Sequence, residues 1–421
     1  MAQKFQTVRL AVLFAYAAGL LSIGLSKDWR LIHEDNGAFY TTVALSHLRL
    51  GLGETRAHDF LVERDAGRKI AYGHHPPGIG LILAGAFKLT GSDDPAVARG
   101  AAIVFHLGSL AIMVALVRSL LGFAAALWAG FFMATLPMGA FFGRMPGYEP
   151  FGLFAVMLQL FSWSRYRGTG SAKFLGFLFL GVILGGLIDW APLFFSLGLF
   201  LFECRQLIRG RGHGPLVLVL GVSGIGIFAL NIVHLYWAQG GSLETFLRVL
   251  GRNKIIAHSK FNIAEFALSQ IERFRRYFSH AGLLAVLCSA WALTRPHSRV
   301  SRWLGMTAAS DTWRALMAVS GLAALAYVCA APKWAKVHHF WQFYFLPYTV
   351  CSLVFFWPAL QQWINKKGRA QWWPLAALFW IELGASSAYT LYARHTRPSA
   401  YTLNAVGEFR ANYLLPSSLS R

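Results

Sequence analysis

The chain has 421 residues, 56% hydrophobic and 14% charged, and its 39 Lys and Arg against 18 Asp and Glu give a net charge of +21. With a mean hydropathy of +0.47 and apolar residues in long runs, an ordinary soluble domain is excluded. The basic residues collect in short loops between these runs, which is the topology signal of membrane proteins. The expected partners are therefore membrane lipids and no nucleic acid.

The apolar runs predict an all-α, polytopic integral membrane protein that forms a single domain over residues 1–421. A hydrocarbon core about 30 Å thick needs roughly 20 apolar residues per helix, which gives about eleven spans, or ten to twelve if short runs merge or split. They centre on Val8–Leu25, Ala96–Leu116, Phe123–Phe142, Pro150–Trp163, Phe174–Ile188, Pro192–Phe202, Pro215–Trp237, Ala281–Leu293, Ala315–Ala331, Gln342–Pro358 and Trp373–Tyr392. The run Pro77–Leu89 is too short to span and is predicted to be an interfacial or re-entrant helix.

Two features of the apolar runs concern processing and cysteine chemistry. No A-x-A cleavage pattern follows the first run, so we expect a retained span and no signal peptide. The four cysteines lie inside or at the edge of apolar runs without metal-ligand spacing. A disulfide framework is therefore not expected.

Loop charges predict the orientation, because loops rich in Lys and Arg stay in the cytoplasm. Together with the N-terminus, the loops on this side carry Arg118; Arg165, Arg167 and Lys173; Arg205, Arg209 and Arg211; Arg295, Arg299 and Arg302; Lys366, Lys367 and Arg369. The outer side then holds residues 26–77, Arg144–Glu149, Asp189–Trp190, residues 239–280, Pro332–Trp341 and the tail 394–421. All the unusual polar residues fall on this outer side.

The first outer loop, residues 26–77, interleaves apolar and polar residues between Phe39 and Leu50, which predicts a helix lying along the membrane surface. The loop 239–280 has a similar pattern around Leu243–Leu250. Neither stretch resembles a separate folded domain, and no internal repeat is visible.

At the start of the first outer loop, Glu34 and Asp35 form an acidic pair. A carboxylate at the membrane surface can act as a general base toward a substrate hydroxyl. The alternative is a solvated loop charge or a helix cap, because Asp35 stands just before the expected surface helix.

At the end of this loop, His74 and His75 precede Pro76 and Pro77. Proline is preorganised for a first helical turn, so it would start the short helix and direct the histidines at the membrane surface. These side chains could bind a phosphate or a metal, or could lie in the headgroup layer.

Two later outer turns also carry ionisable residues. Arg144 and Glu149 lie in the turn before Pro150, where Glu149 could be functional or could be a charge favoured by the helix dipole. Asp189 lies in the tight turn before Pro192, and a polar turn residue is its simpler interpretation.

The last outer turn is basic and aromatic, with Lys336, His338, His339 and, one turn later, Tyr344. Positive side chains on the outer side run against the topology rule, so a bound anion is one explanation. An aromatic and basic belt at the headgroups is the other.

At these residues the sequence resembles the GT-C glycosyltransferases, in particular the bacterial relatives of protein O-mannosyltransferases and of the lipid A aminoarabinose transferase. The resemblance rests on the acidic pair Glu34-Asp35, on His75-Pro76-Pro77-Gly78 before a short apolar helix, on Arg144 with Glu149-Pro150, and on the turn Lys336–Tyr344 followed by Phe345-Leu346-Pro347. There are departures, because His75 stands where the aminoarabinose transferase has lysine and Glu149 where aspartate is common.

The resemblance implies a GT-C-like fold and inverting transfer of a monosaccharide from polyprenyl (undecaprenyl) phosphate to a lipid, glycan or protein acceptor outside a bacterial inner membrane. It implies Asp35 as the base, with Glu34 or Glu149 assisting. His74, His75, Arg144, Lys336, His338, His339 and Tyr344 would face the donor phosphate, whose departing charge needs preorganised partners. No cofactor is required, although a divalent metal could be held.

Two other functions remain open at the level of sequence. A transporter or lipid flippase is also polytopic and basic, but it should carry charges in mid-span and paired discontinuous helices. A noncatalytic assembly subunit that keeps the fold is the third reading.

Overall fold

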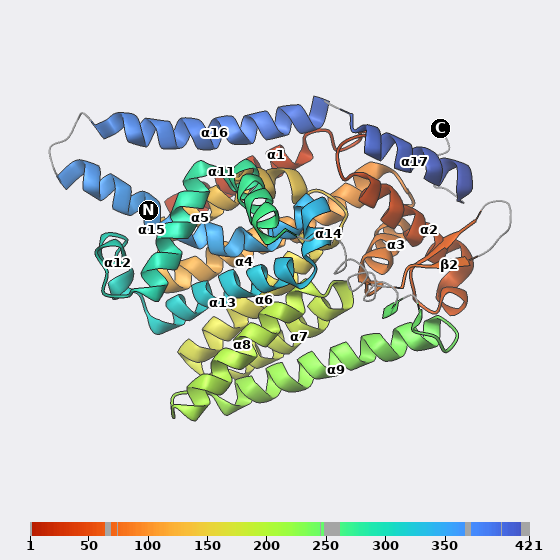
Figure 1. The fold of residues 1–421 in the computed structure, drawn as a ribbon, viewed down its shortest axis with the longest axis horizontal. Coiled ribbons are helices and arrows are strands. Elements are labelled where there is room, and N and C mark those ends of the chain that lie inside the picture. The colour runs from red at the N-terminus through yellow and green to blue at the C-terminus, as the bar shows by residue number, and fades with distance from the viewer. Residues whose placement is uncertain are drawn as a thin grey trace.

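The computed structural model describes residues 2–63, 69–73, 75–244, 246–247, 262–366, 372–396 and 398–413, and these are mostly helical (Figure 1). In chain order the elements are α1 (Ala2–Ser22), α2 (Asp35–Thr55), β1 (Phe60–Val62), β2 (Lys69–Ala71), α3 (Gly78–Thr90), α4 (Pro95–Leu121), α5 (Phe123–Thr135), the π-helix η1 (Met138–Phe142), α6 (Tyr148–Thr169), α7 (Ala172–Ile188), α8 (Ala191–Ile208), α9 (Gly214–Ala238), α11 (Ile263–Thr294), α12 (Arg299–Trp303), the 3-10 helix η3 (Met306–Ala308), α13 (Asp311–Ala330), α14 (Pro332–Val337), the 3-10 helix η4 (His339–Phe345), α15 (Leu346–Lys366), α16 (Trp373–Thr396) and α17 (Ala400–Asn412).

Seven helices in the described ranges are long and apolar enough to cross a membrane, so the chain is an integral membrane protein. These candidate spans are Gln3–Ser22, Pro95–Leu121, Ala191–Ile208, Gly214–Ala238, Ile263–Thr294, Asp311–Ala330 and His339–Asn365. The other expected spans are helical too, in α5, α6, α7 and α16, but these helices fall outside the seven. The expected count of about eleven therefore stays a prediction.

The expected span Phe123–Phe142 is not one continuous helix. Its first part, α5, ends at Thr135, and Leu136 is extended with φ −53° and ψ 133°. Pro137 explains the break, because a residue before proline is pushed out of the helical region. The chain resumes as the π-helix η1, whose five residues are all buried.

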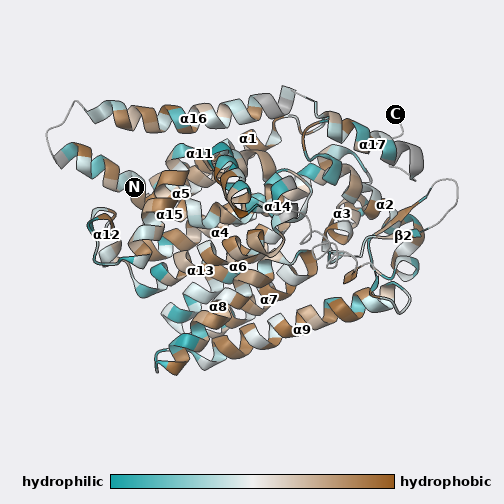
Figure 2. Ribbon diagram, in the orientation of Figure 1, coloured by the Kyte–Doolittle hydropathy of each residue, from teal (hydrophilic) through white to brown (hydrophobic). Residues whose placement is uncertain are grey.

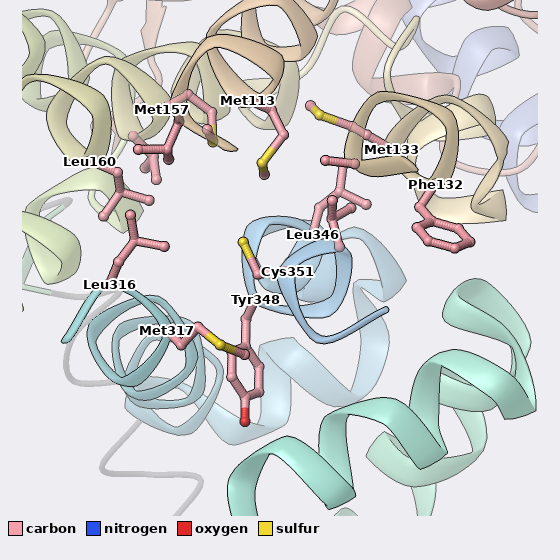
Figure 3. Close-up of a cluster of buried hydrophobic side chains, with 14 of the residues drawn as sticks. Met113, Phe132, Met133, Met157, Leu160, Leu316, Met317, Leu346, Tyr348 and Cys351 are labelled. Atoms are coloured by element: carbon pink, nitrogen blue, oxygen red, sulfur yellow. The ribbon is translucent and has the colours of Figure 1, made fainter. Parts of the chain in front are cut away.

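The main core lies where α4, α5, α6, α13 and α15 meet. Figure 3 shows Met113, Met157, Met317 and Cys351 among the side chains that fill it, and all four belong to one buried cluster. Apolar residues also continue around the outside of α9 (Figure 2), where Leu218 and Ile225 are exposed. A helix that is apolar on its outer face suits contact with lipid tails.

A second apolar cluster organises the end of the molecule that carries α2, α3 and the hairpin β1–β2, with α17 beside them (Figure 1). Its members include Trp29, Ile79, Phe151 and Val406, from the first outer loop, α3, α6 and α17. The N-terminus and α12 lie at the opposite end. The helix α3 lies within one residue of the expected short helix Pro77–Leu89, and α2 occupies the expected surface helix, whereas the hairpin was not predicted.

The start of α3 packs directly against the end of α7. A Cβ atom built on Gly78 would lie 2.4 Å from the carbonyl oxygen of Leu187. Only a glycine fits this approach. The residues just before Gly78 are therefore held beside the residue that follows α7, which is Asp189.

Candidate functional site

The contact between His75 and Asp189 lies at the centre of the site. Nδ1 of His75 is 3.3 Å from Oδ1 of Asp189, and the Asp189 side chain is fully buried. Oδ1 accepts a hydrogen bond from the backbone N–H of Trp190 at 2.7 Å, and Oδ2 accepts one from the hydroxyl of Tyr344 at 2.9 Å. Three segments far apart in the sequence thus meet on one carboxylate.

Aromatic rings enclose His75 from several elements. The imidazole stacks on Tyr148 with ring centroids 4.1 Å apart, and Tyr72 stacks on it from the hairpin at 6.1 Å. On the far side of Asp189, Tyr344 lies 5.5 Å from Tyr327 of α13. Gly152 makes room for Tyr344, since a Cβ there would lie 2.1 Å from the tyrosine hydroxyl oxygen. The site is therefore shielded from bulk water, which strengthens its electrostatic interactions.

Glu149 lies in the first turn of α6, just before the apolar stretch Pro150–Trp163, and is buried. Burial above all, together with the nearby Asp189 carboxylate, raises the pKa of Glu149 to about 8. The carboxyl group is thus largely protonated at neutral pH, and it can exchange a proton near the pH at which an enzyme works.

The acidic pair at the start of the first loop is divided between two environments. Oε2 of Glu34 accepts hydrogen bonds from the backbone N–H groups of Arg30 and Leu31, at 3.0 and 2.9 Å. Oε1 lies 3.0 Å from Arg99 and 3.5 Å from Arg144. Both carboxylate oxygens of Glu34 therefore stabilise the fold of the first outer loop. Arg144, which was expected near the donor phosphate, instead contacts the Glu34 carboxylate.

Asp35 faces the C-terminal helix. Its Oδ1 lies 3.5 Å from the hydroxyl of Thr402 on α17, and that hydroxyl donates to the carbonyl of Leu31 at 2.8 Å. Asp35 is half-buried, and burial raises its pKa from 3.8. Within the described residues, Asp35 forms no hydrogen bond or ion pair with His75 or Asp189.

The late turn contributes one histidine close to His75. Burial above all, together with the neighbouring His75 and Arg273, lowers the pKa of His338 to about 4. At neutral pH His338 is therefore uncharged and can offer a phosphate a hydrogen bond but no charge. Lys336 forms an ion pair with Glu265 of α11, and Nδ1 of His339 lies 2.9 Å from the hydroxyl of Tyr277.

Sequence reasoning missed Arg99 and the pair His47 and Asp59. Arg99 is a charge inside an apolar run, a pattern that itself signals a buried partner. Nε2 of His47 lies 3.4 Å from Oδ1 of the fully buried Asp59, and Nδ1 lies 2.9 Å from Thr55. Burial raises the pKa of Asp59. Only the bend of the loop brings these side chains together.

Metal binding was left open by the sequence. Within the described ranges, no group of three or more His, Cys, Asp and Glu side chains is arranged to hold a metal ion. His74, one of the expected phosphate or metal ligands, lies outside the described residues. So do parts of the loop 239–280 and of the tail 394–421.

Comparison with known proteins gives one family match. A family model for dolichyl-phosphate-mannose-protein mannosyltransferase matches residues 74–237, which begin at the His-His-Pro-Pro segment and include Arg144, Glu149 and Asp189. A sequence search of curated proteins finds no match.

Three solved structures are similar in fold at low sequence identity. ArnT from Cupriavidus metallidurans bound to undecaprenyl phosphate has a TM-score of 0.53 at 15% identity, over 86% of this chain and 61% of that one. The apo Archaeoglobus fulgidus oligosaccharyltransferase has a TM-score of 0.54 at 13% identity, over 99% and 59%. AglB from the same organism, in complex with an inhibitory peptide and a dolichol-phosphate, has a TM-score of 0.51 at 14% identity, over 96% and 58%.

The chain thus spans only 58 to 61% of the length of these structures. At such low identity the similarity concerns the fold. The helical fold of the chain is thus similar to the folds of these proteins, and the family model matches residues 74–237, which are less than half of the chain.

Proposed function

We propose that this protein transfers one sugar from a polyprenyl phosphate to an acceptor hydroxyl, with inversion at the anomeric carbon. The observation that carries the proposal is the buried constellation of His75, Asp189 and Tyr344, with Glu149 beside it. Undecaprenyl phosphate in the ArnT structure and dolichol-phosphate in the AglB structure support a lipid phosphate as donor.

The reaction forms a bond between the acceptor oxygen and the anomeric carbon and breaks the bond from that carbon to the phosphate oxygen. The phosphate leaves with the electron pair, so groups that favour negative charge must already stand in place. Asp189 holds the Nδ1 side of His75 and so orients the imidazole. We assign His75 to the phosphate, together with the neutral His338.

The acceptor proton must go to a base, and two carboxyl groups are candidates. The family resemblance favours Asp35, whose side chain faces α17. The geometry favours Glu149, because it is buried near Asp189 and has a pKa of about 8. We propose Glu149 as the base, and the variants below separate it from Asp35.

The test measures sugar transfer from an undecaprenyl-phosphate sugar by the purified full chain in detergent, with the product identified by mass spectrometry. Glu149→Gln should reduce turnover by about 10²-fold or more, which is the usual contribution of a positioned base. Asp35→Asn should keep most of the turnover. Glu54→Gln, a fully exposed carboxylate paired with Lys69, is the control.

The reverse outcome, full turnover by Glu149→Gln and none by Asp35→Asn, would move the base to Asp35. If the wild type shows no turnover with any donor sugar, the proposed transferase activity is contradicted, and a role as a noncatalytic assembly subunit is favoured. Treatment with EDTA tests the expectation that no metal is required, since the phosphate is already a leaving group.

The transporter alternative depends on charges inside spans. Arg99 lies in the candidate span Pro95–Leu121, but its guanidinium reaches Glu34 and the carbonyls of Leu25 and Lys27 in the segment between α1 and α2. The charge is thus used to attach the loop. Transport of labelled lipid by reconstituted protein without any sugar product would favour the flippase.

A further inference from the structure

His33 is in a backbone conformation that its residue type rarely adopts. Its φ is +64°, and the other described residues with positive φ that are not glycine are Arg56, Ala57 and Ser279. A side chain with a Cβ is strained in this region, and such residues persist where the surrounding structure imposes them, often at functional sites.

The neighbours of His33 impose this conformation. Glu34 closes the turn by accepting the N–H groups of Arg30 and Leu31, and its own N–H donates to the Leu31 carbonyl at 3.0 Å. Arg99 and Arg144 bind the other carboxylate oxygen of Glu34. A buried ion-pair network thus holds a turn whose tip is His33.

The imidazole of His33 points into the protein and meets the late turn. It is 9% exposed. Its ring centroid lies 5.1 Å from both His339 and Phe340, in edge-on contacts, and 6.3 Å from Phe142 of η1. His33 therefore lies beside the turn that carries His338 toward His75.

We propose that His33 is a positioning residue for the donor phosphate: its ring braces His339 and Phe340 and so fixes the turn that presents His338. Glu34 is then the anchor of this device and not a catalytic acid. Among the consecutive residues His33, Glu34 and Asp35, it is thus His33 that helps to position the donor phosphate. This inference rests on the proposed function, since it assumes a lipid phosphate at His75 and His338.

The test uses glycine substitutions, because glycine relieves the strain of a left-handed backbone. His33→Gly should melt at or above the wild-type temperature yet bind undecaprenyl phosphate about tenfold more weakly or worse, since small displacements of binding groups are costly. Ala57→Gly, with φ +50° in the turn that follows α2, is the matched control and should bind as the wild type does.

If His33→Gly fails to fold, His33→Asn replaces it, because asparagine tolerates the left-handed region and removes the ring contact. A double-mutant cycle with His339→Ala measures the coupling between the two residues in binding undecaprenyl phosphate. A purely structural role of His33 would not produce such coupling. The two losses in affinity should be less than additive, because both variants disturb one turn.

Additive losses, or wild-type affinity in His33→Gly, would overturn the inference while leaving the proposed function intact. If the wild type itself does not bind undecaprenyl phosphate, the proposed function fails and the inference falls with it.

Discussion

At the scale of single residues, the charge of Arg99 is buried within an apolar helix, and such a charge has a high free-energy cost. Its guanidinium lies 4.3 Å from the ring of Trp29 and 3.0 Å from Glu34. A buried charge is tolerated only with such partners, and removing one partner leaves the other uncompensated. The network therefore fixes the first outer loop to α4.

We predict that Arg99→Met destabilises the protein by about 3–5 kcal/mol, because it leaves Glu34 buried with one cation fewer. The measurement is thermal or denaturant unfolding in detergent. Arg49→Met, at an exposed position of α2, is the control and should change stability by less than about 0.5 kcal/mol. Equal unfolding curves for both variants would contradict the role of Arg99.

A second prediction at this scale concerns Glu149 and pH. Its folded pKa of about 8 lies above its usual value of 4.5, so the folded state binds this proton more tightly than the unfolded state. The resulting stability is fully present below pH 4.5 and is lost as pH rises through 8. Glu149→Gln should therefore lose less stability than the wild type between pH 5 and 8.

The same shift predicts the pH dependence of transfer. If ionised Glu149 is the base, turnover should rise with pH through about 8. If turnover is instead constant from pH 6 upward, the base that accepts the acceptor proton is a group with a lower pKa than Glu149.

Sequence reasoning found many of the residues at the site but not their partners. His75, Glu149, Asp189, Tyr344 and His338 were all singled out. That Glu34 binds Arg99 and Arg144, or that Asp189 is shared by His75 and Tyr344, depends on contacts between distant segments. One sequence without long-range information contains no signal for such pairs.

At the scale of elements, the approach of α3 to α7 sets the position of His75. We predict that Gly78→Ala lowers both the stability of the protein and the rate of sugar transfer. Its Cβ would lie 2.4 Å from the Leu187 carbonyl oxygen, and moving the backbone to relieve this clash costs free energy. The effect on transfer should appear in turnover, since the displaced imidazole is the group proposed to face the departing phosphate.

The matched control is Gly85→Ala in the same helix, where a Cβ would meet nothing within 4 Å. It should stabilise α3 by up to about 1 kcal/mol, because alanine favours helix more than glycine does. If Gly78→Ala behaves like Gly85→Ala, the close packing of α3 on α7 is not what positions the site.

The sequence predicted the types of most helices correctly, but it predicted the residues at which they begin and end less well. The apolar run over Pro77–Leu89 and the surface pattern after Asp35 both became helices, because periodicity and proline signals are local. The break at Pro137 could have been read from the proline rule. The hairpin β1–β2 could not, because its two three-residue strands are stabilised by packing against α2 and not by their own pattern.

At the scale of the whole molecule, the first outer loop and α17 gather at one end, with α12 at the other (Figure 1). The charge rule assigns these ends to opposite sides of the membrane. We predict that a single cysteine at Ser92, in a cysteine-free background, reacts with a membrane-impermeant thiol reagent from outside. A cysteine at His297, beside α12, should react only after the membrane is opened.

Both positions are exposed, so access should depend on sidedness alone. Labelling of the His297→Cys variant in sealed cells, with protection of Ser92→Cys, would invert the topology and move the site to the cytoplasm.

The contacts of α17 bear on how the protein is made. The N–H of Ser399 donates to the carbonyl of Arg30 at 2.8 Å, Thr402 reaches Leu31 and Asp35, and Tyr413 pairs with Glu63. The ribosome synthesises α17 long after the first loop has emerged. The part of the first outer loop that carries Asp35 therefore lacks these contacts until α17 has been synthesised, so it reaches its native conformation late in the assembly of the protein.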